Sequence, residues 1–108
     1  MDYFHALEGR ARFDPVRMGK LDVVRGSTLM AGLNTFEPGQ SQRIHAHEGA
    51  DKFYLVLSGK ASITVGDSTR EATAGTLVWA PAGVPHGVET ALERTVMLVA
   101  MAPPPGGG

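Results

Sequence analysis

The sequence predicts an all-β fold, a sandwich or barrel of short strands. Much of it consists of short runs rich in Val, Ile, Thr, Leu and aromatic residues, which favour strands. Turn-forming residues separate these runs, and no stretch carries a long helical period of apolar residues. Many short strands with regular turns are typical of antiparallel barrels and sandwiches. The expected strands are 21–25, 28–36, 43–47, 52–57, 61–65, 76–80 and 95–101.

We expect one domain that covers residues 1–102. The first 20 residues are polar and irregular. Within them, Asp14 followed by Pro15 predicts a single helical turn, because aspartate caps helices and proline is favoured at the first helical position. Residues 103–108 read "PPPGGG" and cannot join a ladder of backbone hydrogen bonds, so we expect a disordered tail.

Two of the expected strands are apolar on both faces. The run "ASITV" alternates apolar and polar residues, as in a sheet with one solvated side, whereas "FYLVL" and "TVMLVAM" are apolar in both directions. A strand in a single-walled barrel turns only one face to the interior, so its other face needs a cover. In a chain of this size we expect a second subunit to supply it, which predicts a homodimer. The alternative is that the N-terminal segment folds back over this wall.

Composition excludes several classes of function. The net charge is -1 and 6% of the residues are aromatic, so neither nucleic acid nor an anionic membrane is an expected partner. Without cysteine the chain forms no disulfide, thiolate metal site or cysteine nucleophile. We find no signal peptide and no apolar run of the roughly 20 residues that span a bilayer. We therefore expect a soluble cytoplasmic protein.

The run "RIHAH" places His45 and His47 one residue apart. Alternate residues of a strand share a face, so the two imidazoles would lie side by side, with backbones roughly 6–7 Å apart. Such a pair can converge on one ion, and imidazole suits Zn, Cu, Fe and Ni. Two ordinary solvated histidines would have the same spacing, so the pair alone is weak evidence. A third histidine, His86 in "PAGVPHG", follows a proline–glycine turn and can face the pair across the barrel.

Through these histidines and the residues around them the chain resembles the cupin superfamily. The family's first motif is G-x5-H-x-H-x(3,4)-E-x6-G, and its second is G-x5-P-x-G-x2-H-x3-N. The matching residues over 39–59 are Gly39, His45, His47 and Gly59. The matching residues over 75–90 are Gly75, Pro81, Gly83 and His86. The resemblance implies a jelly-roll β-barrel (double-stranded β-helix), often dimeric, with a divalent metal (Fe, Mn, Ni, Zn or Cu) held by His45, His47 and His86.

Two positions depart from the cupin motifs. Thr90 stands in place of the asparagine, a mild change because threonine can also hydrogen-bond. Counting six residues back from Gly59 places Lys52 where the family has its glutamate ligand. An ammonium group repels a divalent ion, and inside a pocket it must lose its proton, move away or pair with an anion. The three histidines are therefore carried over from the family, whereas the glutamate is not.

Four arrangements of the site remain open. In the one we favour, the three histidines bind a metal without a carboxylate and leave positions for water or substrate. In two others, a fourth ligand joins them: Asp51 through a local bulge, or Glu48 from the loop after the histidine pair. In the last, no metal is bound and Lys52 binds an anionic small molecule; Arg43, on the strand face of His45, could join it, although we expect Arg43 to be a solvated residue at the rim.

The sequence supports two kinds of function. As an enzyme, the protein would resemble cupin dioxygenases or isomerases, with Lys52 anchoring a substrate carboxylate and Tyr54 hydrogen-bonding to it. As a binding module, it would hold a small anionic ligand unchanged, as cupin sensor domains do. The pocket lining that strand alternation predicts is Tyr54, Val56, Ile63, Val65 and one face of residues 76–80, carrying either Val78 or Leu77 with Trp79. These side chains would give a mostly apolar cavity for a small organic molecule.

Overall fold

The computed structural model describes residues 2–105. Within this range the chain is built from strands and turns, and none of it forms a helix long and apolar enough to cross a membrane. The strands are β1 (Gly19–Arg25), β2 (Met30–Phe36), β3 (Gln42–His45), β4 (Asp51–Ser58), β5 (Lys60–Val65), β6 (Ser68–Thr73), β7 (Leu77–Ala80), β8 (His86–Ala91) and β9 (Thr95–Ala102).

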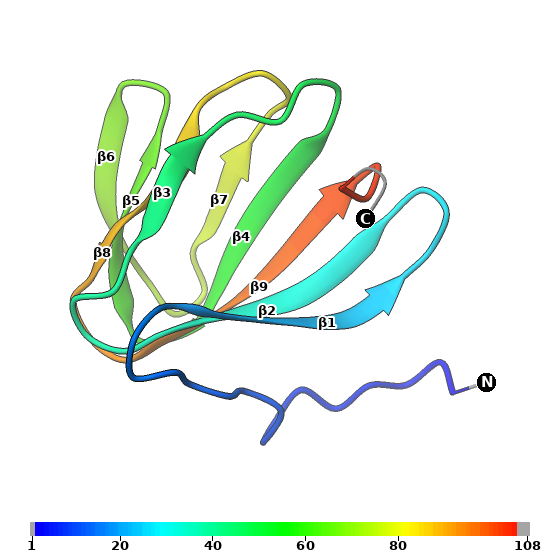
Figure 1. Ribbon diagram of the computed structural model, residues 1–108, viewed down its shortest axis with the longest axis horizontal. Helices are drawn as coiled ribbons and strands as arrows, with labels where there is room; N and C mark the ends of the chain where they lie inside the picture. Colours follow the sequence, from blue (N-terminus) through cyan, green and yellow to red (C-terminus); the bar gives the residue numbers. More distant parts are fainter. Residues whose placement is uncertain (1, 106–108) are drawn as a thin grey trace.

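The strands form two sheets that face each other (Figure 1). One sheet has five strands in the order β1-β2-β9-β4-β7, and the other has four in the order β3-β8-β5-β6. All pairings are antiparallel. Several neighbours, such as β2 and β9 or β3 and β8, come from distant parts of the chain, which is the jelly-roll arrangement. The predicted all-β fold class is confirmed.

The hydrophobic core fills the space between the two sheets. Along β4, Tyr54 and Val56 point inward and are fully buried, whereas Phe53 and Leu55 point outward and are half-buried. Strand alternation therefore assigned the inward face of β4 correctly. Tyr54 and Val56 pack against core residues of both sheets, such as Met97. Their side chains are part of this packed core.

The outer face of the five-stranded sheet is apolar and partly uncovered. Leu77 and Trp79 of β7 are 55% and 52% exposed. They lie in register with Leu55 and Phe53 of β4. The N-terminal segment runs beside β1 and β2, where Thr35 donates a hydrogen bond of 2.6 Å to one of its carbonyls (Figure 1). The chain's own N-terminal segment thus covers one end of this wall and leaves the β4–β7 end open.

Two strands and one turn differ from the expectation. β6, "STREAT", is polar and mostly exposed, so pairing with β5 rather than an apolar pattern stabilises it. β8 was also missed, because glycine and polar residues interrupt its apolar pattern. The helical turn after Asp14 is absent: its carboxylate accepts a hydrogen bond of 2.7 Å from the Val16 N–H, and the chain bends directly into β1.

The predicted disordered tail is described only in part. At its start, Pro105 accepts a hydrogen bond of 2.7 Å from the Arg25 guanidinium through its carbonyl oxygen. This contact brings the segment after β9 next to the end of β1. Residues 106–108 of the predicted tail lie outside the described residues.

Candidate metal centre

Three histidines from different parts of the chain meet at one end of the barrel. His45 ends β3, His47 lies in the loop that follows, and His86 begins β8 opposite His45. Their ring centroids are 4.6 Å (His45–His86), 4.7 Å (His45–His47) and 5.5 Å (His47–His86) apart. One nitrogen from each ring lies within 4.8 Å of the other two. The structure therefore brings together the three residues that the motifs singled out.

Backbone carbonyls orient two of these rings. Nδ1 of His45 lies 2.8 Å from the Arg43 carbonyl oxygen, and Nδ1 of His86 lies 2.9 Å from that of Val84. A carbonyl only accepts hydrogen bonds, so Nδ1 carries the proton in both rings and Nε2 keeps a free lone pair. Nε2 of His86 is buried and has no hydrogen-bond partner among the described residues. A neutral imidazole with a free Nε2 is the form that binds a metal.

Burial keeps His47 and His86 neutral. Burial, and after it the nearby Lys52 charge, lower the pKa of His86 to about 4, against the opposing effect of the Val84 hydrogen bond. The pKa of His47 is also lowered, first by burial and then by the neighbouring His45 and Lys52. Both rings are therefore held in the deprotonated form that a metal requires at neutral pH.

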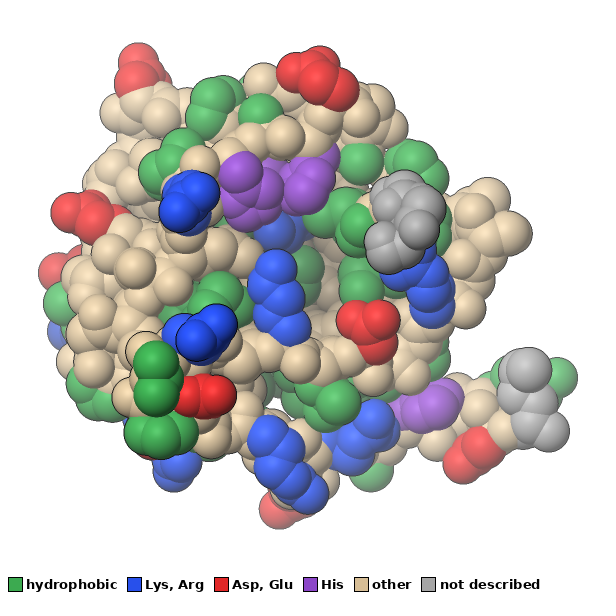
Figure 2. Space-filling view, viewed as in Figure 1, with side chains coloured by type: hydrophobic (Ala, Val, Ile, Leu, Met, Phe, Trp, Pro, Cys, Tyr) green, Lys and Arg blue, Asp and Glu red, His purple; other side chains and the backbone are tan. Residues whose placement is uncertain are grey.

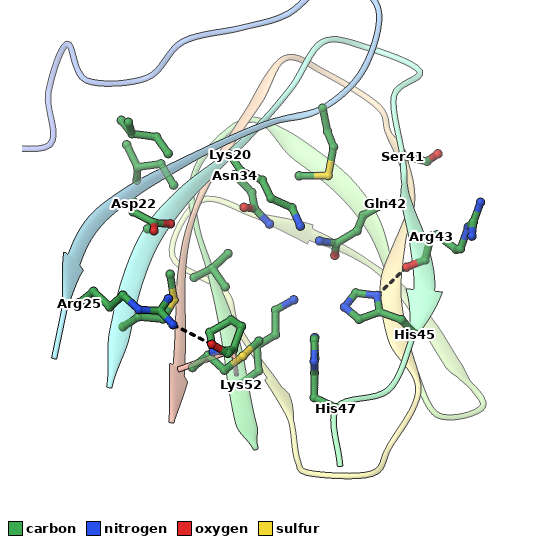
Figure 3. Close-up of a pocket in the computed structure, with 18 residues that line it drawn as sticks. Lys20, Asp22, Arg25, Asn34, Ser41, Gln42, Arg43, His45, His47 and Lys52 are labelled. Carbon is green, nitrogen blue, oxygen red and sulfur yellow. Dashed lines mark hydrogen bonds between the residues drawn. The ribbon is translucent and has the colours of Figure 1, made fainter. Parts of the chain in front are cut away.

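A β-bulge in β3 sets which side chains reach the site. Gln42 pairs with Val88 and His45 with His86, so β3 has one more residue than β8 between these pairs. Gln42 is buried and His45 half-buried, while Arg43 between them is exposed. Strand alternation had placed Arg43 beside His45, and this is wrong, because the extra residue turns Arg43 toward solvent (Figure 3).

The two acidic candidates for a fourth ligand do not join the histidines. Asp51 is exposed, and its Oδ1 accepts a hydrogen bond of 2.9 Å from the Ala82 N–H. β4 pairs regularly with β9 at Asp51, so the bulge that would bring it inward is absent. Glu48 is exposed and its carboxylate lies beside Gly83, whose N–H donates to the His47 carbonyl at 3.0 Å. These contacts fix the loop that carries His47.

Lys52 points into the barrel, as its position in the motif predicts. It is 4% exposed, and its ammonium lies 4.8 Å from the centre of the Tyr54 ring. Among the described residues no carboxylate lies within ion-pair distance of it. Burial lowers its pKa to about 8, and the charge of Lys20 contributes. A buried ammonium with only an aromatic ring beside it is costly, and pairing with an anion would offset this cost.

A cavity of about 620 Å³ opens beside the histidines. Figure 2 shows this hollow, with histidine side chains at one edge and lysine and arginine side chains around it. His45, His47 and Lys52 contribute to its wall, together with residues that sequence analysis did not single out. Three polar ones point into it, namely Lys20, Asn34 and Gln42 (Figure 3). These three lie on strands that long-range pairing brings together, so no local pattern marks them.

The predicted pocket lining is wrong. Tyr54 and Val56 belong to the packed core, and the Tyr54 hydroxyl donates a hydrogen bond of 2.5 Å to Oε1 of Gln42. Ile63 and Val65 border a different hollow of about 440 Å³, which no histidine lines. The cavity beside the histidines is more polar than expected, because its walls are the inward faces of β1, β2 and β3 rather than the centre of the barrel.

Comparison with known proteins identifies the family. A family model described as a cupin domain matches residues 32–101. An uncharacterized protein from Streptomyces coelicolor is 37% identical over 86 residues, which cover 78% of this chain and 79% of that protein. H2HPP isomerase from Bacillus subtilis is 36% identical over 77 residues, which cover 70% of this chain and 32% of that enzyme. The chain thus spans about a third of the isomerase's length.

A solved structure extends this similarity to the fold. The crystal structure of TT1209 from Thermus thermophilus matches with a TM-score of 0.89 and 36% sequence identity. The match covers 94% of this chain and 98% of that one. Sequence, strand order and the histidine cluster therefore agree, and this chain belongs to the cupin family.

Proposed function

We propose that His45, His47 and His86 bind one divalent metal ion through Nε2. The observation that carries this proposal is the buried, unpartnered Nε2 of His86. A buried polar atom without a hydrogen bond costs about 1–3 kcal/mol, and a metal ion would satisfy it. The Nδ1–H bonds to backbone carbonyls support the same role, since histidine ligands usually donate their second nitrogen in this way. Fe, Mn, Ni, Zn and Cu are the candidate ions.

The substrate we infer is a small anionic molecule in the cavity beside the histidines. Lys52 stands where the cupin motif has a carboxylate ligand, so the site has one negative charge fewer and one positive charge more. A bound anion restores this balance, because it can pair with the Lys52 ammonium while one of its oxygens approaches the metal. When bound, the metal would supply Lewis-acid or redox chemistry at that oxygen.

The reaction we infer is an isomerisation or a dioxygenation of this molecule. The similarity to H2HPP isomerase supports an isomerisation. In either reaction Lys52 would hold the anionic group in place, and the histidine rings would fix the position of the ion. Tyr54 is fully buried and its hydroxyl already bonds to Gln42, so its role would be to orient Gln42 rather than to bind substrate.

The second candidate is a cupin that binds an anionic ligand without a metal. It is favoured by the buried Lys52 ammonium, whose charge is close enough to lower the pKa of both His47 and His86. A positive charge this close to the histidines repels a divalent ion and so weakens metal binding. The two proposals differ in one observable: in the first, metal loading strengthens anion binding, and in the second it has no effect.

Replacing Lys52 with methionine tests both proposals. We expect Lys52→Met to weaken binding of succinate by at least about tenfold, because a charge-assisted hydrogen bond to a buried ammonium is lost. Isothermal titration should be run on metal-free and on metal-loaded protein. The matched control is Lys60→Met, since Lys60 pairs with Glu71 at 3.7 Å on the surface and lines no part of this cavity. Unchanged succinate affinity in Lys52→Met would rule out an anion at this lysine.

We further propose that the chain forms a homodimer through the open end of the five-stranded sheet. The exposed Leu77 and Trp79, continuous with Leu55 and Phe53, form an apolar surface that a second copy can cover. A Trp79→Glu substitution should halve the mass measured by light scattering, to the 11.4 kDa of one chain. Tyr3→Glu changes an aromatic residue that is 80% exposed elsewhere and should leave the dimer intact. A monomeric parent protein would refute this proposal.

A further inference from the structure

The cavity has a second group of hydrogen-bond donors, separate from Lys52. Lys20, Asn34 and Gln42 direct their polar ends toward one another across the cavity, away from His47 (Figure 3). Lys20 on β1 pairs in register with Asn34 on β2. Gln42 lies on β3 in the opposite sheet. Three strands from both sheets therefore contribute to one polar cluster.

The backbone positions of this cluster lie apart from that of Lys52 along the strands. Lys52 is in register with Met101 of β9, which is in register with Met30 of β2. Asn34 lies four residues further along β2 than Met30, which corresponds to roughly 13 Å of strand. The Lys20 and Lys52 side chains both extend into the cavity from these separate positions (Figure 3). The two ammonium groups thus enter the cavity from separate backbone positions, Lys20 from an exposed position on β1, and the Lys20 charge is near enough to lower the pKa of Lys52.

The amides of this cluster are buried and available. Asn34 is 6% exposed, and its side chain makes no hydrogen bond to another described residue. Gln42 is 8% exposed, and its Oε1 accepts from the Tyr54 hydroxyl. Because the oxygen of Gln42 is occupied, its NH₂ group is the part left to face the cavity. The side-chain amide of Asn34 and the NH₂ group of Gln42 face the open cavity, so both can form hydrogen bonds with a ligand there.

The other charged residues of the cavity do not neutralise Lys20 or Lys52. Arg25 donates to the Pro105 carbonyl at 2.7 Å, and Arg43 points away from the cavity (Figure 3). Asp22, the one carboxylate in the lining, is exposed on β1 and forms no ion pair with another described residue. Both ammonium groups therefore remain free to bind an anion.

We propose that the cavity recognises a molecule with two anionic groups, one bound by Lys52 beside the histidines and the other by Lys20, Asn34 and Gln42. The chemical class is a small dicarboxylate or a carboxylate that also carries a phosphate. The carbon skeleton between the two groups lies along the cavity wall formed by Val99 and Met101. This inference rests on the proposed anion site at Lys52 and adds the second site.

Matched pairs of simple acids test the second site directly. Titrations compare malonate, succinate, glutarate and adipate with the monocarboxylates of equal carbon number, for example succinate with butyrate, and inorganic phosphate is included. We expect one dicarboxylate of intermediate length to bind at least about tenfold more tightly than its monocarboxylate partner. Measured at pH 6, where Lys52 with its pKa of about 8 is charged, Lys20→Met should remove this preference by lowering the dicarboxylate affinity far more than the monocarboxylate affinity. Lys60→Met is the control that should change neither value.

The outcomes separate this inference from the proposed function. Equal affinity for mono- and dicarboxylates at every length, or a preference that survives in Lys20→Met, would overturn the second site and leave the site at Lys52 standing. A complete lack of binding by the parent protein would overturn both. Two results together would support both the site at Lys52 and the second site. Lys52→Met should lose monocarboxylate binding, and Lys20→Met should lose only the preference for the dicarboxylate. Metal loading is measured separately and does not enter this comparison.

Discussion

Replacing His86 with alanine is expected to weaken metal binding by more than about 100-fold. His86 is 1% exposed and supplies the one nitrogen of the cluster that is buried without a partner. Loss of an outer hydrogen-bond partner of a metal ligand already costs about 10–100-fold, and loss of the ligand itself should cost more. The measurement is elemental analysis after dialysis against Fe(II), Mn, Ni, Zn or Cu, followed by calorimetric titration of the ion that remains bound.

The control for this experiment is His5→Ala. His5 is exposed and lies outside the cluster, so the variant removes an imidazole without changing the site. A second readout protects against misfolding of His86→Ala: metal should raise the unfolding temperature of the parent protein and of His5→Ala, but not that of the His86 variant. His47→Ala, at a half-buried position outside any strand, should also lose the metal. Metal retained at one ion per chain in both variants would refute the histidine site.

The acid–base state of His86 makes this test informative at neutral pH. Because burial lowers its pKa to about 4, protons compete little with a metal at His86 above about pH 5. The lowered pKa also makes stability depend on pH. The unfolded chain binds a proton at His86 more readily than the folded chain does, so the free energy of unfolding falls as the pH falls. A loss of metal near neutral pH would therefore have to come from another group.

The sequence was sufficient to predict that the three histidines lie together, because the cupin motifs that single them out are short local patterns. The H-x-H spacing and the proline–glycine turn before His86 place His45 at the end of β3 and His86 at the start of β8, whereas His47, expected on the same strand as His45, lies in the loop after it. Strand alternation placed Lys52 on the face of Tyr54 and Val56, and the resemblance to cupins implied that this face points inward, as it does because β4 is regular over its first residues. Each of these predictions needed only one strand and one turn. Pairing between strands then determines how closely the residues approach.

The cavity could not be predicted, because long-range register decides it. Lys20 and Asn34 are 14 positions apart and become neighbours only when β1 pairs with β2. The bulge in β3, which moves Gln42 inward and Arg43 outward, depends on β8 crossing nearby. At Gly87 of β8 a Cβ would lie 2.7 Å from the Gln42 carbonyl oxygen, so glycine permits this approach. Nothing in the composition of β3 itself indicates the extra residue.

Gly59→Ala is expected to destabilise the fold by more than about 4 kcal/mol, a loss that only severe structural conflicts produce. Gly59 forms the turn between β4 and β5 with a φ of 88°. A Cβ there would overlap the Arg94 carbonyl oxygen and lie 2.6 Å from Oγ1 and 2.8 Å from Cα of Thr95. Thr95 cannot move aside, because it is fully buried and its hydroxyl donates to the Glu93 carbonyl at 2.8 Å. Urea denaturation of both proteins measures the difference.

Gly75→Ala separates the two causes of this loss. Gly75 has almost the same φ, 90°, but no atom lies within 4 Å of the position of an added Cβ. Alanine there should cost only the backbone strain of the left-handed conformation, about 1–2 kcal/mol. The difference between the variants then reports the overlap with Arg94 and Thr95 alone. Equal losses would show that the turn at Gly59 relaxes around the methyl group, and that backbone strain rather than close packing makes this motif glycine necessary.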